Sequence, residues 1–569
     1  MRAPSALNLP ALNLRAVACA LASVPLLAYA TVQYTLKVDV PSKSLLVSVT
    51  IDHPKPTETF QIPGWSPGYY VMEKYETKIS GITAAEDGQT VAVKQVDPRT
   101  WSVDSQGAQK LTFSYKVLGD DVGLGFFCAC VKSNTAYTNG PASFMYVPGR
   151  RDEDTSLKIE APTGWKIATP MTAAATGTYT AHDYDEMADD PIEMGQFASR
   201  MFTVDNIPFE AIFVAPPNEQ VRWNVDQETE VLRQVSKPAI DMFHGAPFKR
   251  YLYTFHLTGD GFQGGLEHRS GTVIAIPNEP DIDLSDLAAH EFFHAWNVKQ
   301  IRPSVLGPFD YTQPQRTGNL WFAEGVTDYY AKICTYRSGV HDLAWLLDQF
   351  HDQIGDLQSG ATRLTKTVED SSRAAWENNG FGMDGLDYYN KGLLAGLVFD
   401  AAIRDATNGA KSLDDVMRYM YAKYRMPNPG YGEDGIRDAI DAVAGKNLDA
   451  LYDAVIRSSQ ELPYDNLKAI GLEVLLSRQK AQVALGWPTP LDHIQATDLL
   501  KYGVIKSDRF IRFVPPAKPD TASFMVNENG ATKTVTVPLK EVRLPEFSLI
   551  LDPTPTAQES EAFVAWTRR

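Results

Sequence analysis

Cysteine is scarce: the chain of 569 residues contains four cysteines. Cys19 lies in an N-terminal segment that we expect to be removed, which leaves Cys128, Cys130 and Cys334. An odd number of thiols, two of them separated by a single residue, is badly placed for unstrained disulfides. A CxC pair without a second pair is also a weak zinc signal. We therefore expect neither a disulfide framework nor a cysteine metal site.

Basic residues are also few relative to acidic residues. The chain has 53 Lys and Arg residues against 70 Asp and Glu residues, a net charge of −17. Such a protein is repelled by phosphate backbones and anionic lipids, which argues against binding to nucleic acid or to an anionic membrane. Small or positively charged ligands are the more compatible partners. The sequence also lacks internal repeats and low-complexity tracts, and it leaves the oligomeric state open.

The N-terminal segment has a secretory pattern. Arg2 and Arg15 precede an apolar run at residues 16–27, and Ala-Tyr-Ala follows at residues 28–30. This order is typical of a signal peptide cut after Ala30. The run is too short to span a bilayer comfortably, although an uncleaved anchor is the alternative. We expect an exported protein, periplasmic or secreted, without stable membrane insertion after cleavage.

Residues 31–202 alternate polar and apolar side chains between turn residues, which predicts an all-β domain. Its aromatic segment at residues 63–70 (Pro-Gly-Trp-Ser-Pro-Gly-Tyr-Tyr) is interpreted as a packed loop between strands, with a substrate-binding role as the alternative. Glu193, near the end of the domain, is interpreted as a solvated or capping acid. A ligand-binding role for Glu193 is the alternative.

Strand patterns followed by helical patterns predict a second domain over residues 203–462. The helices are expected at residues 225–245, 283–303, 320–333, 344–354, 391–406, 413–424, 435–443 and 448–456. Residues 463–569 return to short strands, including a hairpin with an Asn-Gly turn at 529–530. This last part weakly resembles half of a PDZ domain, with 485–487 as a candidate carboxylate-binding loop; a small β domain used for packing is the alternative. The fold class predicted is multidomain α+β.

One motif carries the chemistry, and it is His290-Glu291-Phe292-Phe293-His294. Two histidines four residues apart lie on one helix face, as in zinc hydrolases. Zinc catalysis requires a third ligand and an open position, and Glu324 at the start of the next helix is the candidate. Glu291 is then the general base on zinc-bound water. Asp328, one turn beyond Glu324, is either a hydrogen-bond partner of a liganding imidazole or an exposed acid.

Two further groups flank this motif. Tyr388 or Tyr389, at the start of a helix, can offer a hydroxyl to the oxyanion of the reaction. Gly264 and Gly265 allow another chain to approach the backbone, and they place Glu267 and His268 at a sheet edge. A β-turn with solvated tips is the alternative interpretation of this segment.

The motifs together resemble the glycyl aminopeptidase family of zinc metallopeptidases. The resemblance rests on residues 290–303 (HEFFHAWNVKQIRP), 321–330 (WFAEGVTDYY), 264–268 (GGLEH), 389–392 (YNKG) and 65–68 (WSPG). It covers residues 31–460 and implies a β-rich N-terminal domain with a thermolysin-like, mostly helical catalytic domain. The family is distantly similar to aminopeptidase N, and its members often end in a PDZ domain. One Zn²⁺ per chain is implied.

This resemblance also implies roles for individual residues. Glu267 corresponds to the acid that binds the free α-amine of the substrate, in a strand where Gly265 and His268 contact the peptide. His268 replaces an Asn of aminopeptidase N relatives, which puts the positioning of the first peptide carbonyl in doubt. Tyr389 matches the oxyanion tyrosine, so it is preferred to Tyr388. Gln300 stands where the family has Arg, at a helix end away from the ligands.

The resulting hypothesis is an exported zinc aminopeptidase that releases N-terminal Gly or Ala from peptides with a free N-terminus. The first alternative is a zinc endopeptidase whose C-terminal domain presents substrate tails. The second is a peptide-binding protein that has lost catalysis, which the intact His290, Glu291, His294 and Glu324 disfavour.

Overall fold

The computed structural model describes residues 31–121, 126–259, 261–280, 282–360, 362–380, 382, 385–484, 509–514, 521–528, 531–538 and 540–568. The predicted signal peptide at residues 1–30 and the candidate carboxylate-binding loop at 485–487 lie outside the described residues. Within the described part, no helix combines the length and the apolar character needed to cross a membrane.

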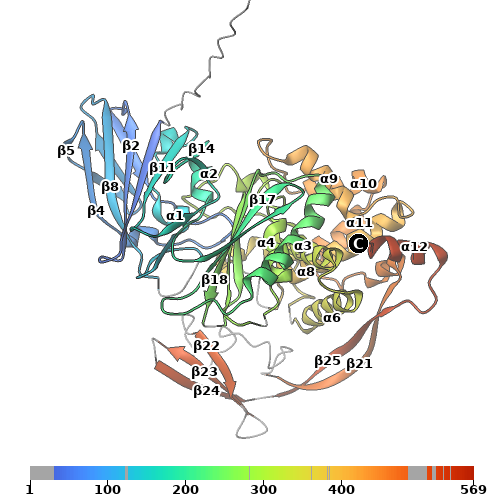
Figure 1. Ribbon diagram of the computed structural model, residues 1–569. Helices are drawn as coiled ribbons and strands as arrows, with labels where there is room; N and C mark the ends of the chain where they lie inside the picture. The colour runs from blue at the N-terminus through green and yellow to red at the C-terminus, as the bar shows by residue number, and fades with distance from the viewer. Residues whose placement is uncertain are drawn as a thin grey trace, which may run out of the picture.

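The N-terminal domain is built mainly of strands, as the period-two pattern predicts (Figure 1). In β1 (Val32–Asp39), Tyr34, Leu36 and Val38 are buried and alternate with more exposed residues. β1 lies inside an eight-stranded sheet, antiparallel to one neighbour and parallel to the other. In spatial order the strands are β13 (Thr172–Ala175), β14 (Thr178–Ala181), β11 (Thr155–Glu160), β1, β2 (Ser44–Asp52), β8 (Lys110–Leu118), β4 (Ile79–Glu86) and β5 (Gln89–Val91).

Two smaller sheets and two short helices complete this domain. The sheets are β12 (Lys166–Ala168), β15 (Ile192–Gly195), β10 (Thr135–Thr138) and β9 (Ala129–Val131), and β3 (Thr57–Gln61), β7 (Thr100–Asp104) and β6 (Lys94–Asp97). The helices are α1 (Gly140–Ser143) and α2 (Tyr184–Asp189). Glu193 lies in β15, which is paired on both sides, and it is buried, bonded to Thr135 and 3.2 Å from Nε2 of His256. The prediction of a solvated or capping acid is wrong.

The second domain contains a five-stranded sheet. Its order is β16 (Ala198–Val204), β17 (Ile207–Val214), β18 (Tyr251–Thr258), β20 (Gly271–Pro277) and β19 (Gly264–His268). β17, β18 and β20 run parallel, whereas β16 and β19 are antiparallel edge strands. β16 crosses the predicted domain boundary at residue 203, so this sheet begins within the last residues assigned to the first domain.

Helices pack against one face of this sheet, and the first domain covers the other face (Figure 1). Phe292 of α4 (Ser285–Phe293) packs against Tyr251 and Tyr253 of β18. At the start of α4, the carboxylate of Asp283 accepts hydrogen bonds from the backbone N–H and the hydroxyl of Ser285 at 2.9 and 2.6 Å. α4 ends ten residues before the predicted stop at Pro303, and turns follow it. The other helices are α3 (Val225–Phe243), α5 (Val326–Ser338), α6 (Leu343–Ser359), α7 (Val368–Arg373), α8 (Tyr388–Ala406), α9 (Leu413–Tyr424), α10 (Gly435–Ala444) and α11 (Asp449–Tyr452).

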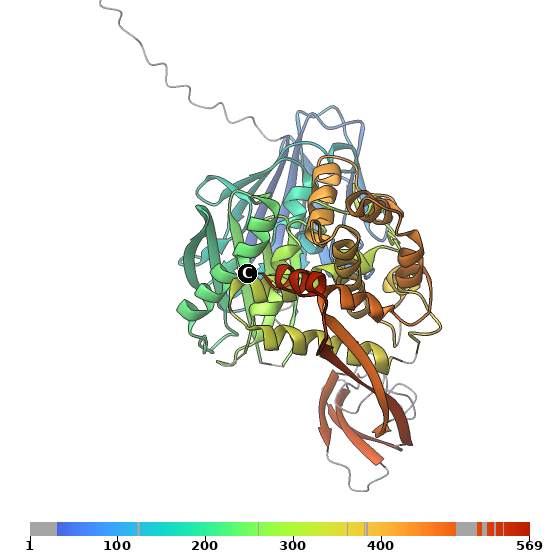
Figure 2. The same ribbon diagram turned by 90° about the vertical axis from the view of Figure 1, so that its right-hand side faces the viewer.

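The described C-terminal residues form a ribbon, a small sheet and a final helix. β21 (Leu472–Ala484) pairs antiparallel with β25 (Lys540–Leu551), and this ribbon leads away from the helices to the sheet of β22 (Arg509–Val514), β23 (Thr521–Glu528) and β24 (Ala531–Pro538) (Figures 1 and 2). β23 and β24 flank the predicted Asn-Gly turn and pair antiparallel, and the turn itself lies outside the described residues. The PDZ-like assignment stays a prediction.

The final helix α12 (Ala557–Trp566) returns to the catalytic helices (Figure 2). The indole N–H of the buried Trp566 donates to the hydroxyl of Tyr329 at 3.1 Å. The hydroxyl of Tyr336 donates to the carbonyl oxygen of Thr567 at 2.9 Å. Helix α12 therefore packs with the second domain, although it follows the C-terminal strands in sequence.

Candidate active site

The imidazoles of His290 and His294 face a common point, with their Nε2 atoms 3.0 Å apart. Nδ1 of His294 lies 2.6 Å from the carbonyl oxygen of Asn297, which can only accept, so Nδ1 carries the proton. Nδ1 of His290 lies 2.8 Å from the carboxylate of Asp328, which fixes the proton there in the same way. Both Nε2 atoms therefore present lone pairs to the space between them.

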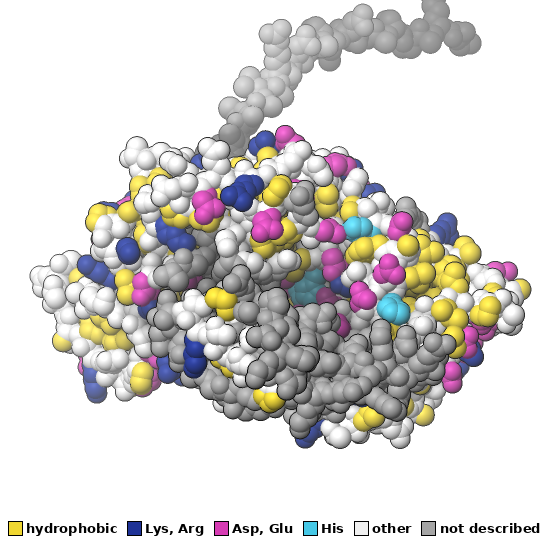
Figure 3. All heavy atoms as spheres, turned by 90° about the horizontal axis from the view of Figure 1, so that it is seen from below, with side chains coloured by type: hydrophobic (Ala, Val, Ile, Leu, Met, Phe, Trp, Pro, Cys, Tyr) yellow, Lys and Arg dark blue, Asp and Glu magenta, His cyan; other side chains and the backbone are white. Residues whose placement is uncertain are grey.

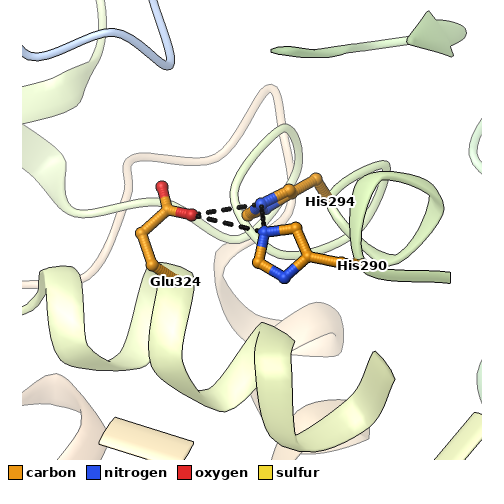
Figure 4. Close-up of side chains that lie close together, drawn as sticks. All are labelled: His290, His294 and Glu324. Atoms are coloured by element: carbon orange, nitrogen blue, oxygen red, sulfur yellow. Dashed lines mark hydrogen bonds and ion pairs between the residues drawn. The ribbon is translucent and has the colours of Figure 1, made fainter. Parts of the chain in front are cut away.

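Glu324 brings a carboxylate to the same point (Figure 4). Its Oε2 lies 3.2 Å from Nε2 of His294 and 3.7 Å from Nε2 of His290. Glu324 lies in a π-helical turn (Trp321–Gly325) that runs directly into α5, and such turns are frequent at functional sites. Two buried imidazole nitrogens and a buried carboxylate, all within 4.8 Å of one another, can hold a cation between them. This donor set suits zinc, with its fourth position left for water or substrate.

Asn297 joins the two segments that carry these groups. Its side-chain amide donates to the carbonyl oxygen of Phe322 at 2.8 Å and to the hydroxyl of Thr327 at 3.1 Å. Its own carbonyl oxygen accepts from the ring of His294. Asn297 thus fixes the turn that carries Glu324 relative to the imidazole of His294.

Strand β19 borders the histidines and supplies a second acid. Carboxylate oxygens of Glu267 and Glu291 and a ring nitrogen of His294 lie within 4.8 Å of one another. Gly265 leaves room for Glu291, because a Cβ at residue 265 would lie 2.3 Å from Oε1 of Glu291. Both acids are buried, and burial raises the pKa of Glu267 and raises the pKa of Glu291 to about 7.

Buried charges lie behind Glu267. Nζ of Lys299 is 2.8 Å from Asp189 and 3.7 Å from Glu267, and all three residues are buried. Although burial raises the pKa of Asp189, Lys299 lowers it to about 2. The ammonium of Lys299 therefore balances part of the negative charge beside Glu267.

His268 is the last residue of β19 and follows Glu267 directly. Adjacent residues of a strand point to opposite faces, so His268 points away from the side that Glu267 occupies. The ring is 2% exposed, its Nδ1 lies 3.9 Å from Asp189, and His268 is not among the residues that line the cleft. The ring therefore packs with the buried charges, and the expected contact of His268 with substrate stays a prediction.

The two candidate tyrosines, Tyr388 and Tyr389, differ in their surroundings. The hydroxyl of the fully buried Tyr388 donates to the carbonyl oxygen of Gly380. Tyr389 lines the cleft, and its ring centre is 6.2 Å from that of His290. A further hydroxyl comes from Tyr70 of the first domain, which donates to Oε1 of Glu324 at 3.3 Å.

The first domain forms one wall of the site through residues 63–70. Gly68 has a φ of +92°, and a Cβ there would lie 2.6 Å from Oε2 of Glu267. The segment is anchored by the indole N–H of Trp65, which donates to the carbonyl oxygen of Asp310 at 2.8 Å. The loop is packed, as interpreted, and it also lines the cleft through Gly68, Tyr69 and Tyr70, so its substrate-binding role stays a prediction.

His290, Glu291 and Asp328 border a cleft of about 420 Å³. It lies between the first domain, β19 and α4, and its lining includes Gly68, Tyr70, Gly265, Glu291 and Tyr389. In the face shown in Figure 3, histidine and acidic side chains are visible in a central hollow. Both domains therefore contribute to one cleft.

Sequence reasoning missed three residues of this arrangement: Tyr70, Asn297 and Lys299. The last two directly follow the histidine motif, and polar residues within a run that is otherwise apolar were an available signal of buried contacts. Tyr70 has no comparable local signal.

The comparisons with known proteins agree with this geometry. Residues 33–196 match the Peptidase M61 N-terminal domain, and residues 283–395 match the M61 glycyl aminopeptidase domain. No curated protein matches the chain. An aminopeptidase N family protein from Idiomarina loihiensis has a similar fold, with a TM-score of 0.76 and 20% identity over 95% of this chain and all (100%) of that one. An M1 zinc metallopeptidase from Deinococcus radiodurans gives a TM-score of 0.47 and 14% identity over 76% of this chain and 94% of that one.

The predicted multidomain α+β fold, with a β-rich first domain and a mostly helical catalytic domain, is confirmed. The second family match contains His290, His294, Glu324 and Tyr389. These two matches and the geometry of the site identify the chain as a zinc aminopeptidase that is similar to the M61 glycyl aminopeptidase family.

Proposed function

We propose that this protein is an exported aminopeptidase that removes N-terminal Gly or Ala from peptides. The observation that carries the proposal is the position of Glu267. Its carboxylate lies beside Glu291 and His294 and is closed off on one side by Gly68. A peptide whose carbonyl reaches the histidines can place its α-ammonium against Glu267, where a charge-assisted hydrogen bond forms, but its chain cannot continue past Gly68.

The space beside Glu267 supports the preference for small residues. A cavity of about 20 Å³ lies there, lined by Trp65, Gly68, Tyr70 and Lys299 among others. This volume holds about one water molecule, and a hydrogen or methyl side chain has a comparable size. A larger first side chain would have to displace the packed aromatic rings around it.

The roles of the other residues follow from their positions. His290, His294 and Glu324 would hold one zinc ion per chain, which supplies Lewis-acid polarisation of the carbonyl and a water of lowered pKa. Glu291 takes a proton from the attacking water and passes it to the leaving nitrogen. The hydroxyl of Tyr389 donates to the oxyanion that develops on the carbonyl oxygen. Substrate-binding roles are proposed for Glu267 and for the backbone at Gly265.

Export is supported by the N-terminal sequence alone. The basic, apolar and Ala-Tyr-Ala segments of residues 1–30 form the pattern of a cleaved signal peptide. A periplasmic or secreted location follows from it, and cleavage after Ala30 is testable by N-terminal sequencing of the mature protein.

The decisive experiment compares free and blocked substrates. We expect the 4-nitroanilides of Gly and Ala to be hydrolysed, and their N-acetyl forms to be inert, because an acetylated nitrogen carries no charge for Glu267. Equal cleavage of the blocked forms would favour the endopeptidase alternative and refute the role of Glu267. The variant Glu267→Gln should lose most activity on the free substrates.

The variant Glu291→Gln tests the base. It should keep its zinc, measured by atomic emission, and lose activity by several orders of magnitude, since the base is removed and the ligands are not. Glu324→Gln is the matched control and should lose zinc. Substantial activity of Glu291→Gln would contradict the mechanism.

A further inference from the structure

The cleft lies along the first two residues of β19, Gly264 and Gly265, on one side of Glu267. Along β19, Glu267 is followed towards the start of the strand by Leu266, Gly265 and Gly264. The carboxylate of Glu291 packs against Gly265, so the carbonyl under attack lies level with this residue. A substrate with its amine at Glu267 therefore runs antiparallel to β19, and its second residue falls beside Gly264.

Strand β19 can hold such a chain in an extended conformation. It is an edge strand, paired with β20 on one side in the described sheet. An extended peptide can add to the other edge through backbone hydrogen bonds, and one residue advances it by about 3.3 Å. Gly264 and Gly265 are partly exposed, whereas Leu266 and Glu267 are buried, so the strand is open at the end where the second residue would lie.

Aromatic rings gather at this open end. A Cβ at Gly264 would lie 3.1 Å from Cζ of Phe262 and 3.5 Å from Cζ of Phe126. Phe126 packs edge-on against Phe127, with ring centres 4.3 Å apart, and Phe127 stacks on Tyr69 with ring centres 3.6 Å apart. These four residues all line the cleft.

The size and chemistry of this part of the cleft differ from those beside Glu267. The cleft measures about 420 Å³, against about 20 Å³ for the cavity at Glu267. Phe262 is 50% exposed, so apolar area remains to be covered by a ligand. The charged residues that line the cleft are acidic apart from His290, with no Lys or Arg among the described ones. An acidic side chain would find no cation there.

We propose that Tyr69, Phe126, Phe127 and Phe262 form the pocket for the side chain of the second substrate residue, and that this pocket selects aromatic or large aliphatic side chains. The inference rests on the proposed aminopeptidase function and adds a second specificity to it. The preferred substrates are then peptides with a small first residue and a large apolar second residue, such as Ala-Phe and Gly-Leu.

The test uses the full-length zinc-loaded enzyme and four dipeptides: Ala-Phe, Ala-Leu, Ala-Ala and Ala-Asp. We expect kcat/KM for Ala-Phe and Ala-Leu to exceed that for Ala-Ala by about 10- to 100-fold, the range that one apolar pocket supplies. Ala-Asp should be the poorest substrate. Cleavage of all four dipeptides at equal kcat/KM would overturn the pocket while leaving the aminopeptidase function intact, whereas no cleavage of any of them would overturn the proposed function itself.

Variants of Phe262 test whether this side chain determines the preference for the second substrate residue. Because this side chain is half exposed, its replacement is expected to leave the fold intact. Phe262→Ala should lower the ratio of kcat/KM for Ala-Phe over Ala-Ala by about 10-fold, and Phe262→Leu should retain most of it. Met201→Ala, at an exposed methionine of β16 that does not line the cleft, is the matched control and should keep the parental ratio. A parental ratio in Phe262→Ala would refute the proposal.

Discussion

His268 makes the fold sensitive to mild acid. Burial lowers the pKa of His268 from 6.5 to about 4, and Asp189, 3.9 Å away, offsets only part of this effect. The ammonium of Lys299 lowers the pKa further. The ring is therefore neutral in the folded protein at pH values where it is protonated in the unfolded chain.

The sign and size of the effect follow from proton linkage. Between pH 6.5 and about 4 only the unfolded state binds the proton, so the free energy of unfolding falls as the pH falls through this range. Above pH 6.5 neither state is protonated at this ring, and well below pH 4 both are. The full difference corresponds to about 3 kcal/mol, and about 2 kcal/mol of it is already lost at pH 5.

The variant His268→Asn removes the titrating group. Urea unfolding of parent and variant should be compared at pH 7.5 and at pH 5. We expect the parent to lose about 2 kcal/mol more than the variant between these values. Asp387 acts in the opposite sense, because burial raises its pKa to about 6, but it is present in both proteins and cancels in the difference. An identical pH dependence of parent and variant would refute this account of His268.

Two further predictions concern residues of the first domain. Tyr70→Phe removes the hydrogen bond to Glu324. The affinity for zinc, measured by competition with a chelator, should then fall about 10-fold. An unchanged affinity would show that the hydroxyl of Tyr70 does not support this ligand. Gly68→Ala places a methyl group 2.6 Å from the carboxylate of Glu267 at a backbone φ of +92°, so kcat/KM for Ala 4-nitroanilide should fall about 100-fold with zinc content retained. Parental kinetics in Gly68→Ala would show that Glu267 is not held by this contact.

The parts of the site that lie close together in sequence were predictable. Helical periodicity alone places His290 and His294 on one face, and Glu324 follows at the start of the next helix. The π-helical turn around Glu324 was not predictable, since it depends on how Asn297 holds this turn. A side-chain amide bridging two helices leaves no periodic signal in the sequence.

The contribution of the first domain could not be predicted from local patterns. Tyr70 and Glu324 are separated by 254 residues, and their hydrogen bond exists only because the two domains pack together. The prediction that Glu193 is a solvated or capping acid was wrong for a related reason. Its polarity suggested solvent, but β15 has a neighbour on each side, and His256 of the second domain covers the carboxylate.

Helix α12 affects how the chain can be divided. Because Trp566 returns to bond Tyr329 in the catalytic helices, the strands between β21 and β25 form an insertion with both ends tethered to the same body. Cutting the chain before β21 would remove a buried tryptophan of the catalytic domain along with the small sheet. A minimal enzyme should therefore be made by internal deletion, joining the ends of the ribbon and keeping α12.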